Sequence, residues 1–131
     1  MWRVEQEDDD GCGLACVAMV AGTSYAAVRR TYREVCRKKR TDDVGATSLS
    51  KLKEIMRRHD IAIEGRMKRF AGRKPDDLDL DFDALLKVNP RRDGEKWHWV
   101  IWDHRRHRVL DPKRPPYKRP RYVGYWKLRR L

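Results

Sequence analysis

One segment near the N-terminus is apolar on almost every side. Residues 12–20 read CGLACVAMV and contain no charged side chain. As a helix, this segment has no face suited to water, so it has to be buried on most sides. Gly22 is placed to end the helix, because glycine readily adopts the left-handed conformation common at helix C-termini. We therefore expect the rest of the chain to pack around this segment.

Two more helices are predicted in the first half of the chain. Ser24 can cap a helix over Tyr25–Lys38, whose apolar side chains are spaced to form one stripe. Thr47 or Ser48 can cap a third helix, which begins at residue 49 and ends near residue 60.

The second half changes to the pattern of strands. Trp97–Trp102 is rich in aromatic and β-branched residues, and Val109–Leu110 follows it after a polar turn. Residues 61–63 and 122–128 are further strand candidates, and residues 66–83 are expected to be a loop or weakly extended. Helices followed by antiparallel strands indicate an α+β fold, and the length predicts one domain over residues 1–131.

The chain is strongly basic. Its 131 residues hold 32 Lys and Arg against 20 Asp and Glu, a formal net charge of +12. All of the bases except Arg3 lie in residues 24–75 and 84–131, whereas residues 1–23 and 76–83 have a net negative charge. Such a charge favours an acidic partner, although a charged face selected for solubility is equally compatible. Nucleic acid is the less favoured partner, because the sequence has no zinc-finger spacing, RNP aromatic motif or basic-region heptads.

Three cysteines are too few, and odd in number, for a disulfide framework. We therefore expect free thiols and a reducing compartment. No apolar run approaches the ~20 residues needed to cross a bilayer. The longest run, Leu14–Ala21, follows an acidic stretch and lacks the cationic start of a signal peptide. The expected localisation is cytoplasmic without membrane insertion, delivery into another cell stays open, and the sequence does not indicate an oligomeric state.

Cys12 stands in the first turn of the predicted buried helix. The unpaired N–H groups and partial positive charge of a helix N-terminus stabilise a thiolate. Gly11 and Gly13 flank it, so the backbone can enter the helix sharply and a substrate can approach closely. Cys16 is expected to be a small core residue, and Cys36 a half-buried residue of the second helix. For Cys12 itself, an inert buried thiol is the alternative.

A thiolate nucleophile needs an imidazole to exchange protons and a third group to orient that imidazole. His98 opens the best predicted strand of the second half, and Asp111 follows the next strand. If these strands form a hairpin, the carboxylate comes to lie beside the imidazole. Gln6 precedes Cys12 by six residues, and its amide can donate to the oxyanion formed on an attacked carbonyl, together with the Cys12 N–H.

The segment from Gln6 to Gly22, QEDDDGCGLACVAMVAG, resembles the N-terminal motif of the C39-like, papain-fold cysteine peptidases. In that family a Gln precedes a Cys-Gly by a short acidic spacer, and a helix of small residues follows. Residues 45–49, GATSL, are similar to the family's Gly-Thr-Ser segment. Residues 98–102 and 109–112 resemble its His strand and its Asp-Pro turn.

The resemblance implies a papain-like fold and a cysteine peptidase that uses no cofactor and no metal. It implies Cys12 as the nucleophile, His98 as the general base and acid, Asp111 as the residue that orients His98, and Gln6 as the oxyanion donor. The substrate would be a peptide or protein, acidic if it complements the basic chain. Gly11 departs from the acidic residue usual in the family, and the transmembrane segments of the exporter-linked members are missing, which implies a stand-alone member.

Other functions stay open at this point. The same frame can serve as a basic binding or toxin-type domain that acts on nucleic acid or on an acidic protein. Trp97, Trp99 and Trp102 can stack on bases, although the core or the wall of a cleft is the simpler place for them. A metal site built from Cys12, Cys16 and a histidine lacks the second pair of ligands typical of zinc sites.

Overall fold

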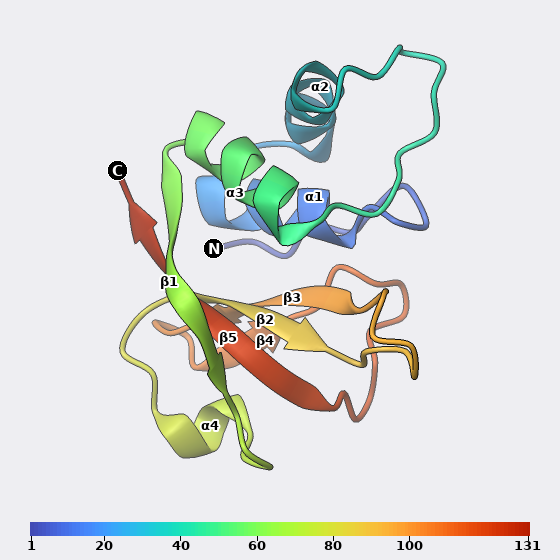
Figure 1. The fold of residues 1–131 in the computed structure, drawn as a ribbon. Helices are drawn as coiled ribbons and strands as arrows, with labels where there is room; N and C mark the ends of the chain where they lie inside the picture. The colour runs from blue at the N-terminus through green and yellow to red at the C-terminus, as the bar shows by residue number, and fades with distance from the viewer.

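Three helices from the first half of the chain cover one face of a sheet formed by the second half. In the computed structural model, which describes all 131 residues, α1 spans Cys12–Ala21, α2 spans Tyr25–Val35 and α3 spans Leu49–Arg58. Figure 1 shows α1 next to the sheet and α2 farthest from it. The α+β class expected from the sequence is confirmed.

The five strands form one antiparallel sheet. They lie in the order β1-β5-β2-β3-β4, so the last strand of the chain lies between the first two. A short helix, α4 (Pro75–Leu78), lies on the side of the sheet opposite the three longer helices (Figure 1). The strands are β1 (Ile61–Arg69), β2 (Ala84–Val88), β3 (His98–Asp103), β4 (Arg108–Leu110) and β5 (Tyr122–Arg130).

Both faces of the central strands are buried, because successive side chains of a strand point to opposite sides. Trp99 and Ile101 of β3 pack into the cluster that contains the helices. Val100 and Trp102 of the same strand pack into a smaller cluster around Phe70 on the other face. Trp99 and Trp102 therefore lie on opposite faces of the sheet, each in a core cluster.

Helix α1 is the centre of the larger core, as its composition predicts. Every residue from Gly13 to Val20 is buried, and the helix contacts α2, α3 and β3. Gly22 ends it in the left-handed conformation, with φ of 68°, and its N–H donates to the Ala18 carbonyl. No single helix is long and apolar enough to span a membrane, and only α1 and α2 together, bent by 118°, have the length and composition for it.

The predicted N-caps of the next two helices are present. The Ser24 hydroxyl accepts a hydrogen bond from the Ala27 N–H at the start of α2. At the start of α3, Ser48 and not Thr47 is the cap, because its hydroxyl accepts from the Lys51 N–H. Each bond satisfies one of the N–H groups that a helix leaves without an intrahelical acceptor.

Helix α2 ends three residues earlier than the sequence predicts, at Val35 and not at Lys38. Arg37 has φ of 52°, which turns the chain out of the helix, and the Lys38 N–H closes the end by donating to the Arg33 carbonyl. This is the Schellman pattern with arginine where glycine is usual. Because arginine is common inside helices, Arg37 gives no signal in the sequence that α2 ends there.

The first strand is longer than predicted, and part of the expected loop is ordered. β1 runs from Ile61 to Arg69, not only over residues 61–63, and it pairs with β5 across a bulge between Glu64 and Lys68. The residues added to β1 are mostly charged and exposed, since β1 is an edge strand whose hydrogen bonds to β5 need no apolar pattern. Residues 75–78, also expected as loop, form α4.

The packing of α3 gives a test of the fold. Ile55 is fully buried in the larger core, whereas Lys53 of the same helix is exposed. We expect Ile55→Ala to lower the free energy of unfolding by about 2–5 kcal/mol, because it leaves a cavity. Lys53→Ala should change it by less than about 0.5 kcal/mol. Urea denaturation followed by circular dichroism measures both, and equal effects would contradict this packing.

Candidate active site

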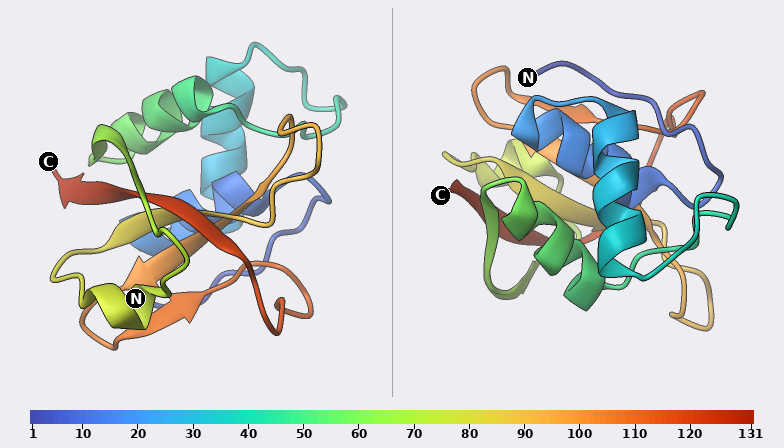
Figure 2. Two further views of the ribbon diagram at one scale, coloured as in Figure 1. Left: turned by 60° about the horizontal axis from the view of Figure 1, so that its bottom comes forward. Right: turned by 90° about the horizontal axis from the view of Figure 1, so that it is seen from above.

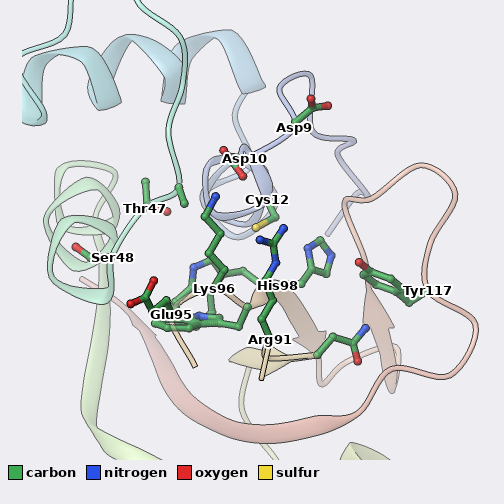
Figure 3. Close-up of a pocket in the computed structure, with 14 residues that line it drawn as sticks. Asp9, Asp10, Cys12, Thr47, Ser48, Arg91, Glu95, Lys96, His98 and Tyr117 are labelled. Carbon is green, nitrogen blue, oxygen red and sulfur yellow. The ribbon is translucent and has the colours of Figure 1, made fainter. Parts of the chain in front are cut away.

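A cleft of about 370 Å³ opens where the helix layer meets the sheet. One wall is the start of α1 with the preceding loop, and residues 46–48 form another. The opposite wall comes from the segment that joins β2 to β3 and from the start of β3 (Figure 3). Its lining side chains are Asp9, Asp10, Cys12, Ala46, Thr47, Ser48, Asn89, Arg91, Glu95, Lys96, Trp97, His98, Trp99 and Tyr117.

Cys12 is the first residue of α1, and its side chain reaches this cleft. Gly11, at the N-cap, offers no side-chain acceptor, so the N–H groups of the first turn have no intrahelical or capping partner. These free N–H groups, and the positive end of the helix dipole, therefore point toward the sulfur and toward any oxyanion formed beside it. Cys16 is buried one turn further on, and burial raises the pKa of its thiol well above the usual value, with the charges of Cys12 and Asp111 adding to the effect. It is therefore a core residue, as expected.

The two glycines beside Cys12 are required by packing. A Cβ at Gly13 would lie 2.4 Å from Thr47 Oγ1, and one at Gly11 would lie 2.1 Å from the Tyr25 hydroxyl oxygen. Both distances are too short for real contacts, so larger residues would push the start of α1 away from its neighbours. The sequence interpretation assigned these glycines to a sharp helix entry and to the close approach of a substrate. The structure adds that Thr47 and Tyr25 leave little room for a Cβ at either position.

His98 and Asp111 are brought together by the hairpin of β3 and β4. Ile101 pairs with Leu110 in the ladder, so the start of β3 and the end of β4 lie at the same end of the hairpin. The His98 Nε2 atom lies 2.7 Å from Asp111 Oδ1. The expected hairpin thus exists, and it places the carboxylate against the imidazole of a residue thirteen positions earlier.

Asp111 is held by more than the histidine. It is buried, and its carboxylate accepts hydrogen bonds from the N–H groups of Lys113 at 2.9 Å and Tyr117 at 3.0 Å. Burial by itself would raise the pKa of Asp111, but the hydrogen bonds from His98, Lys113 and Tyr117 and the charge of His98 lower it overall. The group therefore stays a carboxylate that can orient and stabilise an imidazolium.

The ring of His98 lies between Asp111 and Cys12, and Figure 3 shows it beside the Cys12 sulfur. Burial disfavours the charged ring. The hydrogen bond to Asp111 and the nearby Cys12 side chain, with the charges of both groups, outweigh burial and raise the pKa of His98 to about 9. Since Nε2 binds the carboxylate, Nδ1 is the nitrogen left for the thiol.

Gln6 is not brought into the cleft. Its Nε2 donates to the carbonyls of Asp8 at 3.1 Å and Asp9 at 2.9 Å, and its Oε1 is buried without a partner. Gln6 is not among the residues that line the cleft, so here its amide holds the loop before Cys12. Its role as oxyanion donor stays a prediction, and it requires the amide to leave these carbonyls.

Several lining residues were not singled out from the sequence. Tyr117 packs edge-on against His98, with ring centroids 5.2 Å apart, and covers the side of the ring away from α1 (Figure 3). Arg91 and Lys96 come from the segment between β2 and β3, and Thr47, which the sequence singled out only as a possible helix cap, comes from the segment before α3. These segments have no periodic pattern, so only the charge of Arg91 and Lys96 was visible as a signal.

The site brings together a thiol, an imidazole paired with a carboxylate, and backbone N–H groups without an intrahelical acceptor, a set that is suited to acyl transfer. No group of three or more His, Cys, Asp or Glu side chains is arranged to hold a metal ion. The chain matches no protein-family model, and no curated protein is significantly similar to it.

The pairing of His98 with Asp111 predicts a distinct pH dependence. We expect His98 to remain an imidazolium until the pH approaches about 9, against an ordinary pKa of 6.5. Its charge therefore stabilises the fold fully below about pH 6.5, and this stabilisation is lost as the pH rises through about 9. Asp111→Asn should move the titration of the His98 ring to lower pH, as measured by NMR.

A matched control is available at the far end of the hairpin. Asp83 accepts from His104 Nδ1 at 2.8 Å, so Asp83→Asn also removes a carboxylate from a histidine. This variant should leave the titration of His98 unchanged. If Asp111→Asn left it unchanged as well, the carboxylate would not be what holds the charge on His98.

Proposed function

We propose that this protein is a cysteine hydrolase, and specifically a peptidase, with Cys12 as nucleophile. The observation that carries the proposal is the His98–Asp111 pair, joined at 2.7 Å, with the Cys12 sulfur on the other side of the ring. These three groups come from the start of α1, the start of β3 and the residue after β4. Cys12 and His98 line the cleft, and Asp111 contacts His98 from outside its lining.

The architecture supports a papain-like frame for this chemistry. The nucleophile stands at the N-terminus of a central buried helix, and the histidine and its carboxylate partner come from an antiparallel sheet. The cleft lies between these two parts, as Figure 3 illustrates. The order of the residues along the chain, Cys12 before His98 before Asp111, agrees with the resemblance to the C39-like peptidases.

In the proposed reaction, the Cys12 thiolate adds to the carbonyl carbon of a substrate amide. The negative charge that forms on the oxygen is stabilised by the Cys12 N–H and the dipole of α1. His98 then gives its Nδ1 proton to the leaving nitrogen as the C–N bond breaks, which leaves a thioester on Cys12. Water, deprotonated by His98, hydrolyses the thioester and restores the thiolate. Asp111 keeps the ring oriented and stabilises its charged form throughout.

The walls of the cleft favour a charged substrate. Arg91 and Lys96 line it from the sheet side, and neither forms an ion pair within the protein. Asp9 and Asp10 line it from the side of α1 and are also without ion-pair partners. Glu95 lines the same side as Arg91 and Lys96, so the cleft presents both signs of charge. We propose as substrate an extended peptide segment with an acidic side chain placed at Arg91 and Lys96.

Activity should depend on all three residues. Cys12→Ala is expected to lower peptide cleavage by at least about 10³-fold, because no other group takes over the attack. His98→Ala and Asp111→Asn should also lower the rate strongly. Cys36→Ala removes a thiol outside the cleft and should keep the activity. Mass spectrometry of a mixed peptide library incubated with each variant gives the measurement, and full activity of Cys12→Ala would refute the proposal.

The binding-domain alternative is separated by the reactivity of the thiol. A thiolate–imidazolium pair predicts that iodoacetamide modifies Cys12 rapidly at pH 6, and that His98→Ala slows this reaction. A binding domain that needs no nucleophile predicts slow labelling that His98→Ala does not change. Peptide mapping assigns the label to Cys12, Cys16 or Cys36, and it also shows whether the buried Cys16 is protected.

Substrate charge gives a further prediction. Arg91→Gln combined with Lys96→Gln should lower kcat/KM for peptides with an acidic residue by about 10–100-fold, since a hydrogen bond to a charged group contributes about 1.5–3 kcal/mol. Cleavage of the matched peptides with Gln in place of Glu should change by less than about threefold. Equal losses for both peptide sets would show that these two residues act on the fold or the loop, and not on substrate charge.

A further inference from the structure

A second hollow, of about 600 Å³, lies on α2 and shares no residue with the cleft. It is dominated by arginine and holds a single acid. Figure 2 shows α2 on the outer side of the helix layer, which leaves this face open. The lining residues are Ala26, Arg29, Arg30, Arg33, Glu34 and Arg40.

The helix period explains how the arginines come together. Residues 26, 29, 30 and 33 follow the i, i+3, i+4, i+7 spacing and lie on one face of α2, while Tyr25, Val28 and Tyr32 occupy the buried face. Arg40 joins them from the segment after the helix. A tight turn holds that segment, because the Asp42 carboxylate accepts from the Lys39 N–H at 2.7 Å and the Asp42 N–H donates to the Lys39 carbonyl.

Most of the positive charge in this hollow is uncompensated. Arg29 lies 3.6 Å from Asp8, and Glu34, the only acid in the lining, is paired with Arg58 at 3.4 Å. Arg30, Arg33 and Arg40 form no ion pair and donate no side-chain hydrogen bond, and the Arg33 Nε atom is buried without an acceptor. On the neighbouring α3, by contrast, Arg57 and Arg58 share Glu54. Positive side chains that lie close together without acidic partners repel one another and destabilise the fold. A bound anion would remove this repulsion and accept the hydrogen bonds that the arginines do not make within the protein.

We propose that this arginine hollow binds the phosphate groups of a polyanion. Guanidinium groups donate pairs of parallel N–H bonds that match phosphate oxygens, and arginine is therefore suited to phosphate in a way that a general positive field is not. The hollow has no aromatic side chain in its lining, so it offers no surface for stacking bases. Recognition is accordingly of phosphate and is independent of base sequence. The phosphates can belong to a nucleic-acid strand or to inorganic polyphosphate.

The test measures binding of a fluorescent 12-nucleotide oligo-dT strand to the full chain by anisotropy. Arg30→Gln/Arg33→Gln/Arg40→Gln should weaken binding by at least about 10-fold and reduce the slope of log K against log salt by about 2, since each lost contact to a single strand removes about 0.7. The control Arg105→Gln/Arg108→Gln/Arg130→Gln changes the net charge equally at exposed positions outside the hollow. It should weaken binding by less than about threefold.

Competition with tripolyphosphate and with poly-glutamate identifies the ligand chemistry. Phosphate recognition predicts that oligo-dT or tripolyphosphate binds the unchanged chain more tightly than the variant that lacks Arg30, Arg33 and Arg40. If oligo-dT binds more tightly than tripolyphosphate, the ligand is a nucleic-acid strand; if tripolyphosphate binds more tightly, it is a free polyphosphate. Poly-glutamate that binds as tightly as both would overturn the proposal, as would equal losses in the two triple variants. Peptide cleavage and Cys12 labelling do not enter these outcomes, so the proposal stands or falls separately from the peptidase activity.

Discussion

The burial of α1 is the constraint on which the rest of the structure depends. Because this helix has no polar face, α2 and α3 must cover it on one side and β3 on the other. Gly13 to Val20 are buried, whereas Cys12 at the N-terminal end lines the cleft. The burial of α1 thus fixes the position of the Cys12 sulfur, which lies at the positive end of a helix dipole and is accessible to solvent.

The sheet supplies the other half of the site through its register. The β3–β4 hairpin sets His98 and Asp111 side by side. The N–H groups of Lys113 and Tyr117, in the segment after β4, donate the other hydrogen bonds to the Asp111 carboxylate. A buried carboxylate is stable only when its oxygens are hydrogen-bonded, so the segment after β4 is as much a part of the site as the strands. Tyr117 belongs to this segment and closes one side of the histidine.

The basic charge of the chain is distributed over distinct places with different consequences. Arg91 and Lys96 line the cleft, where we propose that they act on substrate charge, whereas the arginines of α2 form a separate hollow on the outer side of the helix layer. Other bases are neutralised locally, as Arg57 and Arg58 are by Glu54. A net charge alone does not separate these cases, because it says nothing of which bases have partners.

The sequence by itself determined the buried helix, the cap Ser24, and the hairpin that joins His98 to Asp111, because apolar period, capping hydroxyls and short turns act over few residues. It left open whether Thr47 or Ser48 caps α3, which the structure decided for Ser48. It did not determine the end of α2 at Val35, the length of β1 or the place of Gln6. Left-handed closure at Arg37, pairing of an edge strand with β5, and the amide's contacts to Asp8 and Asp9 decided those. The walls of the cleft were likewise decided only by tertiary structure, since they depend on side chains from segments that have no pattern of their own. In the arginine hollow, the helix period already places Arg29, Arg30 and Arg33 on one face of α2, and tertiary structure added Arg40.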